Sequence, residues 1–267
     1  MMVDKPGILY SDMRDNVRTY DLLLFRGADF VSNTISHIET VMDGSGDFTH
    51  AGIAIRAKDL PESSQLYRPP QDDKLYVFES TASGKIAGGP PGTDGRGHLG
   101  VQVRDMDTLV PIYDGYPSSR LAWLPLREDT RPPINPYQVQ DILDRYTNLM
   151  YDANCLDLLA SAFPVLRSMR RIFRNSCCLL KYMCCMCFTA RRTGRWYFCS
   201  ELVSQIYIDI GVFPDSLNPE DVLPMDFMPR ERNLTADDAS PPKDGATLDA
   251  DKQVPWVFRK VIPFKFR

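Results

Sequence analysis

Five short apolar segments lie between Tyr20 and Leu126. They span residues 20–25, 50–55, 75–79, 101–104 and 121–126. Within the second and third of these segments the side chains alternate with a period of two, which is typical of half-buried β-strands. Polar, proline-bearing or glycine-rich stretches separate the segments and favour turns. Because such strands bury their apolar faces only when they pair, we predict that they share one sheet.

Three further segments have the apolar spacing of an amphipathic α-helix. They cover residues 29–42, residues 135–149 and the stretch that begins at Cys199. Asn135 before Pro136 favours a helix start, and Gly211 favours the end of the last helix. The fold class that we predict is therefore α+β, with a mixed, mainly antiparallel sheet packed against helices. A strand-like segment, residues 256–266, ends the sequence.

The charge balance gives no reason to expect a nucleic-acid partner. The chain of 267 residues has 31 basic and 35 acidic side chains, and its formal net charge is -4. The first residues lack the apolar core of a secretory signal, so we expect a cytoplasmic protein. Five cysteines crowd into residues 177–187. Their spacing is unlike a disulfide framework, and we expect reduced thiols.

Cys199 stands where a thiol is readily activated. It follows the aromatic residues 196–198 and begins the last predicted helix. The helix dipole stabilises an anion at that end, and a neighbouring imidazolium would stabilise it further. Position alone leaves open the alternative that Cys199 is a buried structural cysteine.

The sequence offers only three histidines as a base for this thiol. His37 lies in a predicted helix and His98 in a glycine-rich loop, whereas His50 begins a predicted strand, which holds an imidazole more accurately. Glu79 ends another predicted strand, and a carboxylate there can orient the imidazole. A half-buried strand residue at His50 and a solvated turn carboxylate at Glu79 remain the plainer alternatives.

Four motifs resemble the circularly permuted papain-like amidases of the NlpC superfamily, in particular its YiiX-like branch. They are Tyr20–Gly27 (YDLLLFRG), Phe48–Ile53 (FTHAGI), Val77–Ser80 (VFES) and Phe198–Val203 (FCSELV). Their order, His then Glu then Cys, is that of the permuted branch, whereas papain has its cysteine first. The resemblance covers roughly residues 18–230 and implies a papain-like hydrolase domain there. Residues 1–17 would be an extension, and residues 231–267 an acidic loop with a strand-like tail.

The resemblance implies a role for each matching residue. Cys199 takes the position of the nucleophile, His50 that of its base, and Glu79 that of the group that orients the base. The backbone N–H of Cys199 is the expected oxyanion donor, and Tyr151 is a candidate for a second donor. An ordinary packing role for Tyr151 is the alternative.

The chain departs from the family by a long basic insert, residues 163–195, just before the nucleophile. It carries no acidic residue, and its basic residues alternate with apolar ones and with the cysteine cluster. Such a segment suits an anionic membrane surface but is too short and too charged to span a bilayer. We therefore expect a cytoplasmic, peripheral association with membrane. A helical lid over the cleft is an equally good interpretation of the insert.

The cysteines of the insert have two chemical interpretations. Cys184, Cys185 and Cys187 are candidates for thioester acylation, which would strengthen peripheral binding. Cys184 and Cys187, with Cys177 or Cys178, have partial zinc-site spacing, but a second well-spaced pair and a nearby histidine are missing. We therefore expect no metal and no cofactor.

The function that we expect is hydrolysis of an amide, or a related acyl bond, through a thioester on Cys199. The partner would be a peptide or acyl-amide substrate. The similar lecithin:retinol acyltransferase branch uses the same chemistry on lipid acyl groups, so a lipid acyl hydrolase or acyltransferase is an alternative. A non-catalytic scaffold that keeps the fold is another, although a scaffold has no chemical need for all three residues.

Overall fold

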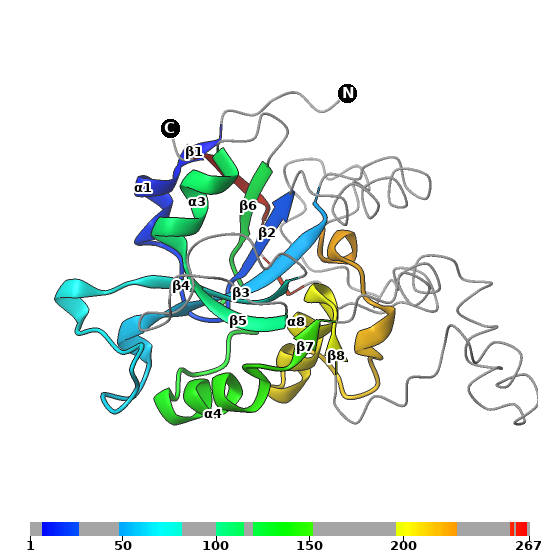
Figure 1. The fold of residues 1–267 in the computed structure, drawn as a ribbon. Helices are drawn as coiled ribbons and strands as arrows, with labels where there is room; N and C mark the ends of the chain where they lie inside the picture. The colour runs from blue at the N-terminus through cyan, green and yellow to red at the C-terminus, as the bar shows by residue number, and fades with distance from the viewer. Residues whose placement is uncertain are drawn as a thin grey trace, which may run out of the picture.

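A computed structural model describes most of the predicted strands and two of the predicted helices. It describes residues 7–26, 48–81, 100–114, 120–151, 196–228, 257–258 and 260–265. The architecture is α+β, with a sheet between two layers of helices (Figure 1). The predicted fold class is confirmed at this level. The predicted helix at residues 29–42 lies outside the described residues.

One seven-stranded sheet forms the centre of the molecule. Its order is β1 (Ile8–Leu9), β9 (Ile262–Lys265), β6 (Arg120–Leu124), β2 (Leu22–Arg26), β3 (His50–Arg56), β4 (Leu75–Thr81) and β5 (Gly100–Asp105). β1 pairs with β9 in parallel, and every other pair in this sheet is antiparallel. All five predicted strands between residues 20 and 126 therefore share one sheet, as predicted.

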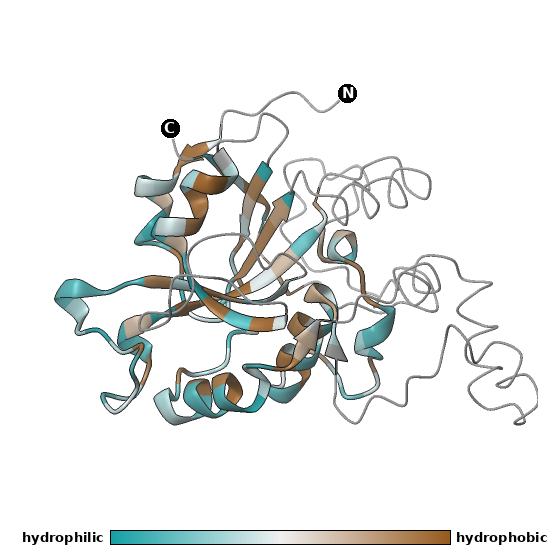
Figure 2. Ribbon diagram, viewed as in Figure 1, coloured by the Kyte–Doolittle hydropathy of each residue, from teal (hydrophilic) through white to brown (hydrophobic). Residues whose placement is uncertain are grey.

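Alternation along the strands divides the buried side chains between the two faces of the sheet. On one face, α4 (Pro136–Tyr146) and α8 (Cys199–Asp209) cover residues such as Leu22, Ile53 and Phe78. On the other face, α1 (Tyr10–Arg14) and α3 (Met106–Asp114) cover residues such as Phe25 and Val77. Figure 2 shows β2 as mostly hydrophobic, whereas α4 presents hydrophilic residues on its outer turns.

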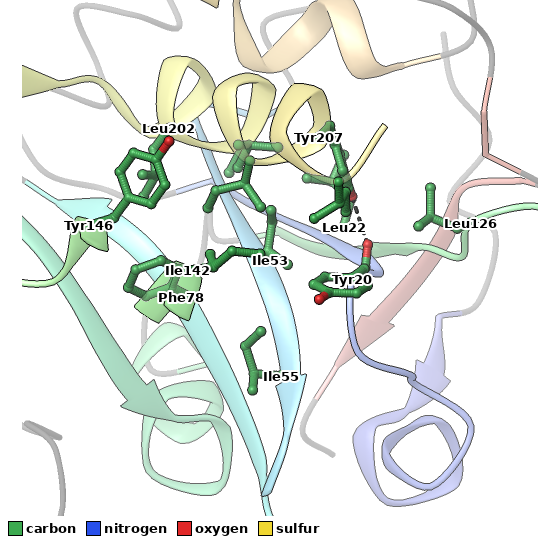
Figure 3. Packing of buried hydrophobic residues seen from close by; sticks show 14 of the residues in the cluster. Tyr20, Leu22, Ile53, Ile55, Phe78, Leu126, Ile142, Tyr146, Leu202 and Tyr207 are labelled. Carbon is green, nitrogen blue, oxygen red and sulfur yellow. Dashed lines mark hydrogen bonds between the residues drawn. The ribbon is translucent and has the colours of Figure 1, made fainter. Parts of the chain in front are cut away.

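The buried stripe of α8 is the one that its sequence predicts. It consists of Leu202, Val203, Ile206 and Tyr207. Figure 3 shows α8 above Leu22, Ile53 and Phe78 of the sheet. The hydroxyl of Tyr207 donates a hydrogen bond to the backbone carbonyl of Tyr20 at 2.9 Å, which joins the helix to the start of β2. Gly211, at a φ of 74°, follows the helix, where residues with a side chain rarely adopt that backbone conformation.

Short elements complete the chain around this core. β7 (Met150–Tyr151) and β8 (Trp196–Tyr197) pair in parallel as a separate two-stranded sheet. Four 3-10 turns lie at Ala57–Asp59, Pro70–Asp72, Pro219–Asp221 and Pro224–Phe227. Among the described residues, no helix is both long and apolar enough to cross a membrane.

Two local predictions differ from the structure. The helix predicted at residues 135–149 ends at Tyr146, because Thr147 is extended and Asn148 has a φ of 67°, outside the helical region. Asn135 does cap this helix, since its side chain accepts a hydrogen bond from the N–H of Tyr137 at 3.0 Å. The helix α3 was not predicted, and it contains Pro111, which opposes helix formation locally.

Candidate active site

His50 and Glu79 meet through the pairing of β3 with β4. Gly52 lies opposite Glu79 in the register, so Glu79 projects on the same side of the sheet as His50, two residues earlier in β3. Nε2 of His50 lies 2.8 Å from Oε2 of Glu79. The side chain of Glu79 is fully buried, and that of His50 is 12% exposed. The carboxylate thus holds one ring nitrogen of a nearly buried imidazole.

Cys199 approaches the same imidazole from α8, of which it is the first residue. It is a free, buried thiol, close enough to His50 to raise the pKa of that imidazole by charge attraction and hydrogen bonding. Since Nε2 of His50 faces Glu79, Nδ1 is the nitrogen left for the sulfur. The structure therefore brings the three predicted residues into one chain of contacts, Cys199 to His50 to Glu79. Their catalytic roles stay a prediction.

The electrostatics of this cluster favour a protonated His50. Burial disfavours the imidazolium, but attraction to Cys199 and Glu79, with hydrogen bonds to both, outweighs it. The pKa of His50 is raised to about 10. In general, an imidazolium beside a thiol favours the ionised form of the sulfur.

Arg104 is a fourth member of the cluster that the sequence did not identify. Its Nη1 donates to Oε1 of Glu79 at 2.7 Å, and the two side chains are 1% and 0% exposed. Burial raises the pKa of Glu79, but the charges of Arg104 and then His50, with their hydrogen bonds, lower it to about 2. The available signal was a charged residue inside the predicted strand at residues 101–104.

Gly52 makes room for the pair. A Cβ built on Gly52 would lie 2.4 Å from Cγ2 of Val77 and 3.2 Å from Cβ of Glu79. The first distance is a clash, and the second is tighter than ordinary contact. The glycine of the His-Ala-Gly sequence therefore leaves space for the side chain of Glu79 to reach His50.

Two serines next to the predicted catalytic residues fix the start of α8. The hydroxyl of Ser80, after Glu79, donates to the carbonyl of Tyr197 at 2.7 Å. The hydroxyl of Ser200, after Cys199, donates to the carbonyl of Val222 at 2.7 Å. Both hydroxyls are buried, so each hydrogen bond ties the backbone beside Cys199 to a neighbouring segment. Sequence patterns carried no signal for either contact.

The first turn of α8 also supplies backbone donors. Its first residues have no intrahelical carbonyl to bond, and the N–H groups point out of the helix start. The first regular helical bond runs from Leu202 N–H to the carbonyl of Phe198. The backbone N–H of Cys199 thus lies where it could donate a hydrogen bond to the oxyanion that forms when the sulfur attacks a substrate carbonyl.

Aromatic rings pack on the imidazole from the side of α3. The rings of Phe25 and His50 are 5.7 Å apart between centroids, and those of Phe25 and Tyr113 are 5.2 Å apart. This packing limits the rotation of His50 and keeps water from one side of the ring.

The remaining candidates are placed in part or lie outside the description. The backbone of Tyr151 pairs with Tyr197, two residues before Cys199, and its side chain lies outside the described residues. The basic insert, including Cys184, Cys185 and Cys187, also lies outside them, as do His37 and His98.

No family model matches the chain, and no curated protein matches it either. The function is therefore inferred from the geometry of the cluster and from the order of its motifs.

Proposed function

We propose that the chain is a cysteine hydrolase that cleaves an amide or related acyl bond through a thioester on Cys199. The observation that carries this proposal is the contact chain from Cys199, at a helix start, through His50 to the buried carboxylate of Glu79. A nucleophile, a base and a group that orients the base are the parts that such chemistry needs.

The reaction has two halves, acylation of Cys199 and hydrolysis of the thioester. Once the proton of Cys199 is on His50, the sulfur attacks the carbonyl carbon of the substrate, forming a C–S bond. The backbone N–H of Cys199 donates to the oxyanion. The intermediate collapses with cleavage of the C–N bond, and the His50 imidazolium gives the proton to the departing amine. Water then attacks the thioester, with His50 taking its proton, and the acid product leaves as the thiol is restored.

Glu79 keeps the imidazole in one orientation throughout. Its Oε2 lies on Nε2, so the ring presents Nδ1 to Cys199, and its negative charge favours the imidazolium formed when Cys199 loses its proton. A carboxylate with a pKa of about 2 stays ionised at neutral pH and does not itself take the proton.

The topology supports a circularly permuted papain-like fold. The base and the carboxylate come from neighbouring antiparallel strands, and the nucleophile follows them in sequence at the start of a helix packed on the sheet. This is the His, Glu, Cys order of the motifs that resemble the permuted amidases of the NlpC superfamily.

The alternative of a merely structural cluster predicts different contacts. Buried ion pairs elsewhere in this chain hold the backbone. Asp21, for example, accepts from the backbone N–H groups of Arg18 and Leu126 as well as from Arg131. Within the described residues, Glu79 instead accepts from two side chains, those of His50 and Arg104. A carboxylate held in this way organises an imidazole rather than a turn.

The test is acylation of the full chain by p-nitrophenyl acetate at pH 7. We expect an acetyl thioester on the peptide that contains Cys199, formed at least about tenfold faster than on any other cysteine. The variants Cys199→Ser and His50→Ala should each abolish this rapid phase, and release of nitrophenol should continue after the first turnover as water resolves the thioester.

The other six cysteines are internal controls, and Ser204→Ala is a matched variant on α8 that leaves the cluster untouched. Two outcomes would contradict the proposal: Cys199 is labelled no faster than the other cysteines, or its labelling is unchanged by His50→Ala. Acylation without turnover would contradict the hydrolase and favour transfer to an acceptor other than water.

A further inference from the structure

We propose that Arg104 is a positioning residue of the site, which holds Glu79 so that its second oxygen is presented, as an anion, to His50. The inference deepens the proposed function and rests on it, since it assigns a role in a reaction that Cys199 and His50 would carry out. Arg104 itself donates a hydrogen bond to Glu79.

The sheet register places Arg104 beside the carboxylate. Arg104 lies opposite Val77, two residues before Glu79 in β4, so both side chains project on the same side of the sheet. The two oxygens of Glu79 are divided between its neighbours: Oε1 accepts from Arg104 at 2.7 Å, and Oε2 lies 2.8 Å from His50. A carboxylate held at both oxygens has no freedom to rotate away from the imidazole.

The contacts of Arg104 distinguish it from the structural arginines of the same sheet. Arg56, also buried, donates to Asp73 at 2.7 Å and to the backbone carbonyl of Arg14 at 2.7 Å. Within the described part of the chain, Nε and Nη2 of Arg104 have no hydrogen-bond partner. A guanidinium that leaves donors unpaired in the interior is costly. The hydrogen bond to Glu79 is therefore the contact that offsets the cost of burying this arginine.

The electrostatic consequence concerns the charge of Glu79. Full burial disfavours a carboxylate, and the charged groups that lower its pKa are Arg104, from β5, and His50, from β3. Those that raise the pKa of His50 are Cys199, from α8, and Glu79. Gln102, opposite Glu79 in the register, is buried and uncharged. Arg104 is thus the permanent cation of the cluster, because His50 loses its charge each time it gives a proton to the departing amine.

The experiment compares Arg104→Met and Arg104→Lys with the matched control Arg56→Met. Arg56 is a buried arginine at the far end of the strand that His50 begins. Two quantities are measured on the full chain: the titration of the Glu79 carboxyl by carbon NMR with labelled glutamate, and the acylation rate with p-nitrophenyl acetate from pH 4 to pH 9.

We expect Arg104→Met to raise the pKa of Glu79 by at least about one unit, because desolvation is then opposed by His50 alone. The acylation rate at pH 7 should fall about tenfold or more, and the acid side of its pH profile should move upward. Arg104→Lys should keep Glu79 ionised but recover only part of the rate, because a single ammonium does not reproduce the planar guanidinium. Arg56→Met should lower stability without moving the titration of Glu79.

A double variant separates positioning from loss of stability. In a Glu79→Gln background, Arg104→Met should cost little further rate, because the group that Arg104 holds no longer carries charge. Unchanged titration of Glu79 in Arg104→Met, or rate losses that follow melting temperature equally in Arg104→Met and Arg56→Met, would overturn the inference. If Arg104→Met does not fold, Arg104→Gln takes its place, with the same rise in the pKa of Glu79 expected.

The two proposals fail in different ways. An inactive parent protein would remove the hydrolase proposal, yet the titration of Glu79 would still report whether Arg104 controls the carboxylate. An active parent with an unshifted Glu79 in the uncharged Arg104 variant would leave the hydrolase and remove only the role of Arg104.

Discussion

Gly52 illustrates how one small residue sets the geometry of the candidate site. It lies between His50 and Ala54 on β3 and directly opposite Glu79 on β4. Its missing side chain leaves the volume in which Val77 and Glu79 pack. Since the glycine sits in a strand and not in a turn, its value comes from close packing and not from backbone freedom.

We predict that Gly52→Ala lowers the melting temperature and the acylation rate together. The new Cβ meets Val77 at 2.4 Å and Glu79 at 3.2 Å, and overpacking of this kind costs roughly 1–3 kcal/mol. Val77→Ala in the same chain should relieve the closer contact and recover part of the stability relative to Val77→Ala alone. Melting curves of the four proteins measure this coupling, and additive losses would contradict the steric explanation.

At the scale of elements, β4 and β8 are joined beside the nucleophile by one side chain. The hydroxyl of Ser80 reaches the carbonyl of Tyr197, which precedes Cys199 by two residues. β4 carries Glu79 and β8 leads into α8, as Figure 1 shows. This hydrogen bond therefore ties the strand that carries Glu79 to the segment that leads to the thiol of Cys199.

We predict that Ser80→Ala costs about 1 kcal/mol of stability, the usual net value of one buried hydrogen bond. The acylation rate should fall by more than the stability loss explains, because α8 is less firmly placed. Ser204→Ala is the matched control. Ser204 is buried on α8, and its hydroxyl has no partner within the described residues. Its removal should leave the melting temperature unchanged or higher, and equal effects of both variants would argue against a special role for Ser80.

At the scale of the whole molecule, the cluster links folding stability to pH. The pKa of Glu79 is lowered from 4.5 to about 2, so its contribution is complete above pH 4.5 and is lost as the pH falls through 2. The pKa of His50 is raised from 6.5 to about 10, so its contribution is complete below pH 6.5 and is lost as the pH rises through 10.

We therefore predict that the cluster stabilises the fold most between about pH 4.5 and pH 6.5. The free energy of unfolding, from urea titrations of the parent and of His50→Ala, should differ most in that interval. The difference should shrink toward pH 9, because above pH 6.5 the unfolded chain loses the His50 proton that the folded chain keeps up to about pH 10. A difference that stays constant from pH 5 to pH 9 would mean that folding does not raise the pKa of His50.

Much of the architecture was visible in the sequence, because alternation along a strand and the stripe of a helix are local patterns. They predicted the five strands between residues 20 and 126, the cap at Asn135 and the buried face of α8. They missed α3, because Pro111 argues against a helix in the sequence, whereas packing on the sheet stabilises one. They also extended α4 past Tyr146, because the apolar stripe continues to Leu149 although the backbone turns first.

The sequence by itself determined which residues are candidates for the proposed chemistry: a cysteine before a helical stripe, a histidine at a strand start and a carboxylate at a strand end. Only the tertiary structure decided that Arg104 lies on Glu79, that Gly52 clears the space between strands and that Ser80 ties β4 to β8. The physical reason is the distance along the chain over which each feature is determined. Periodicity is written within a few neighbouring residues, whereas these contacts depend on the register between strands that lie far apart in the chain.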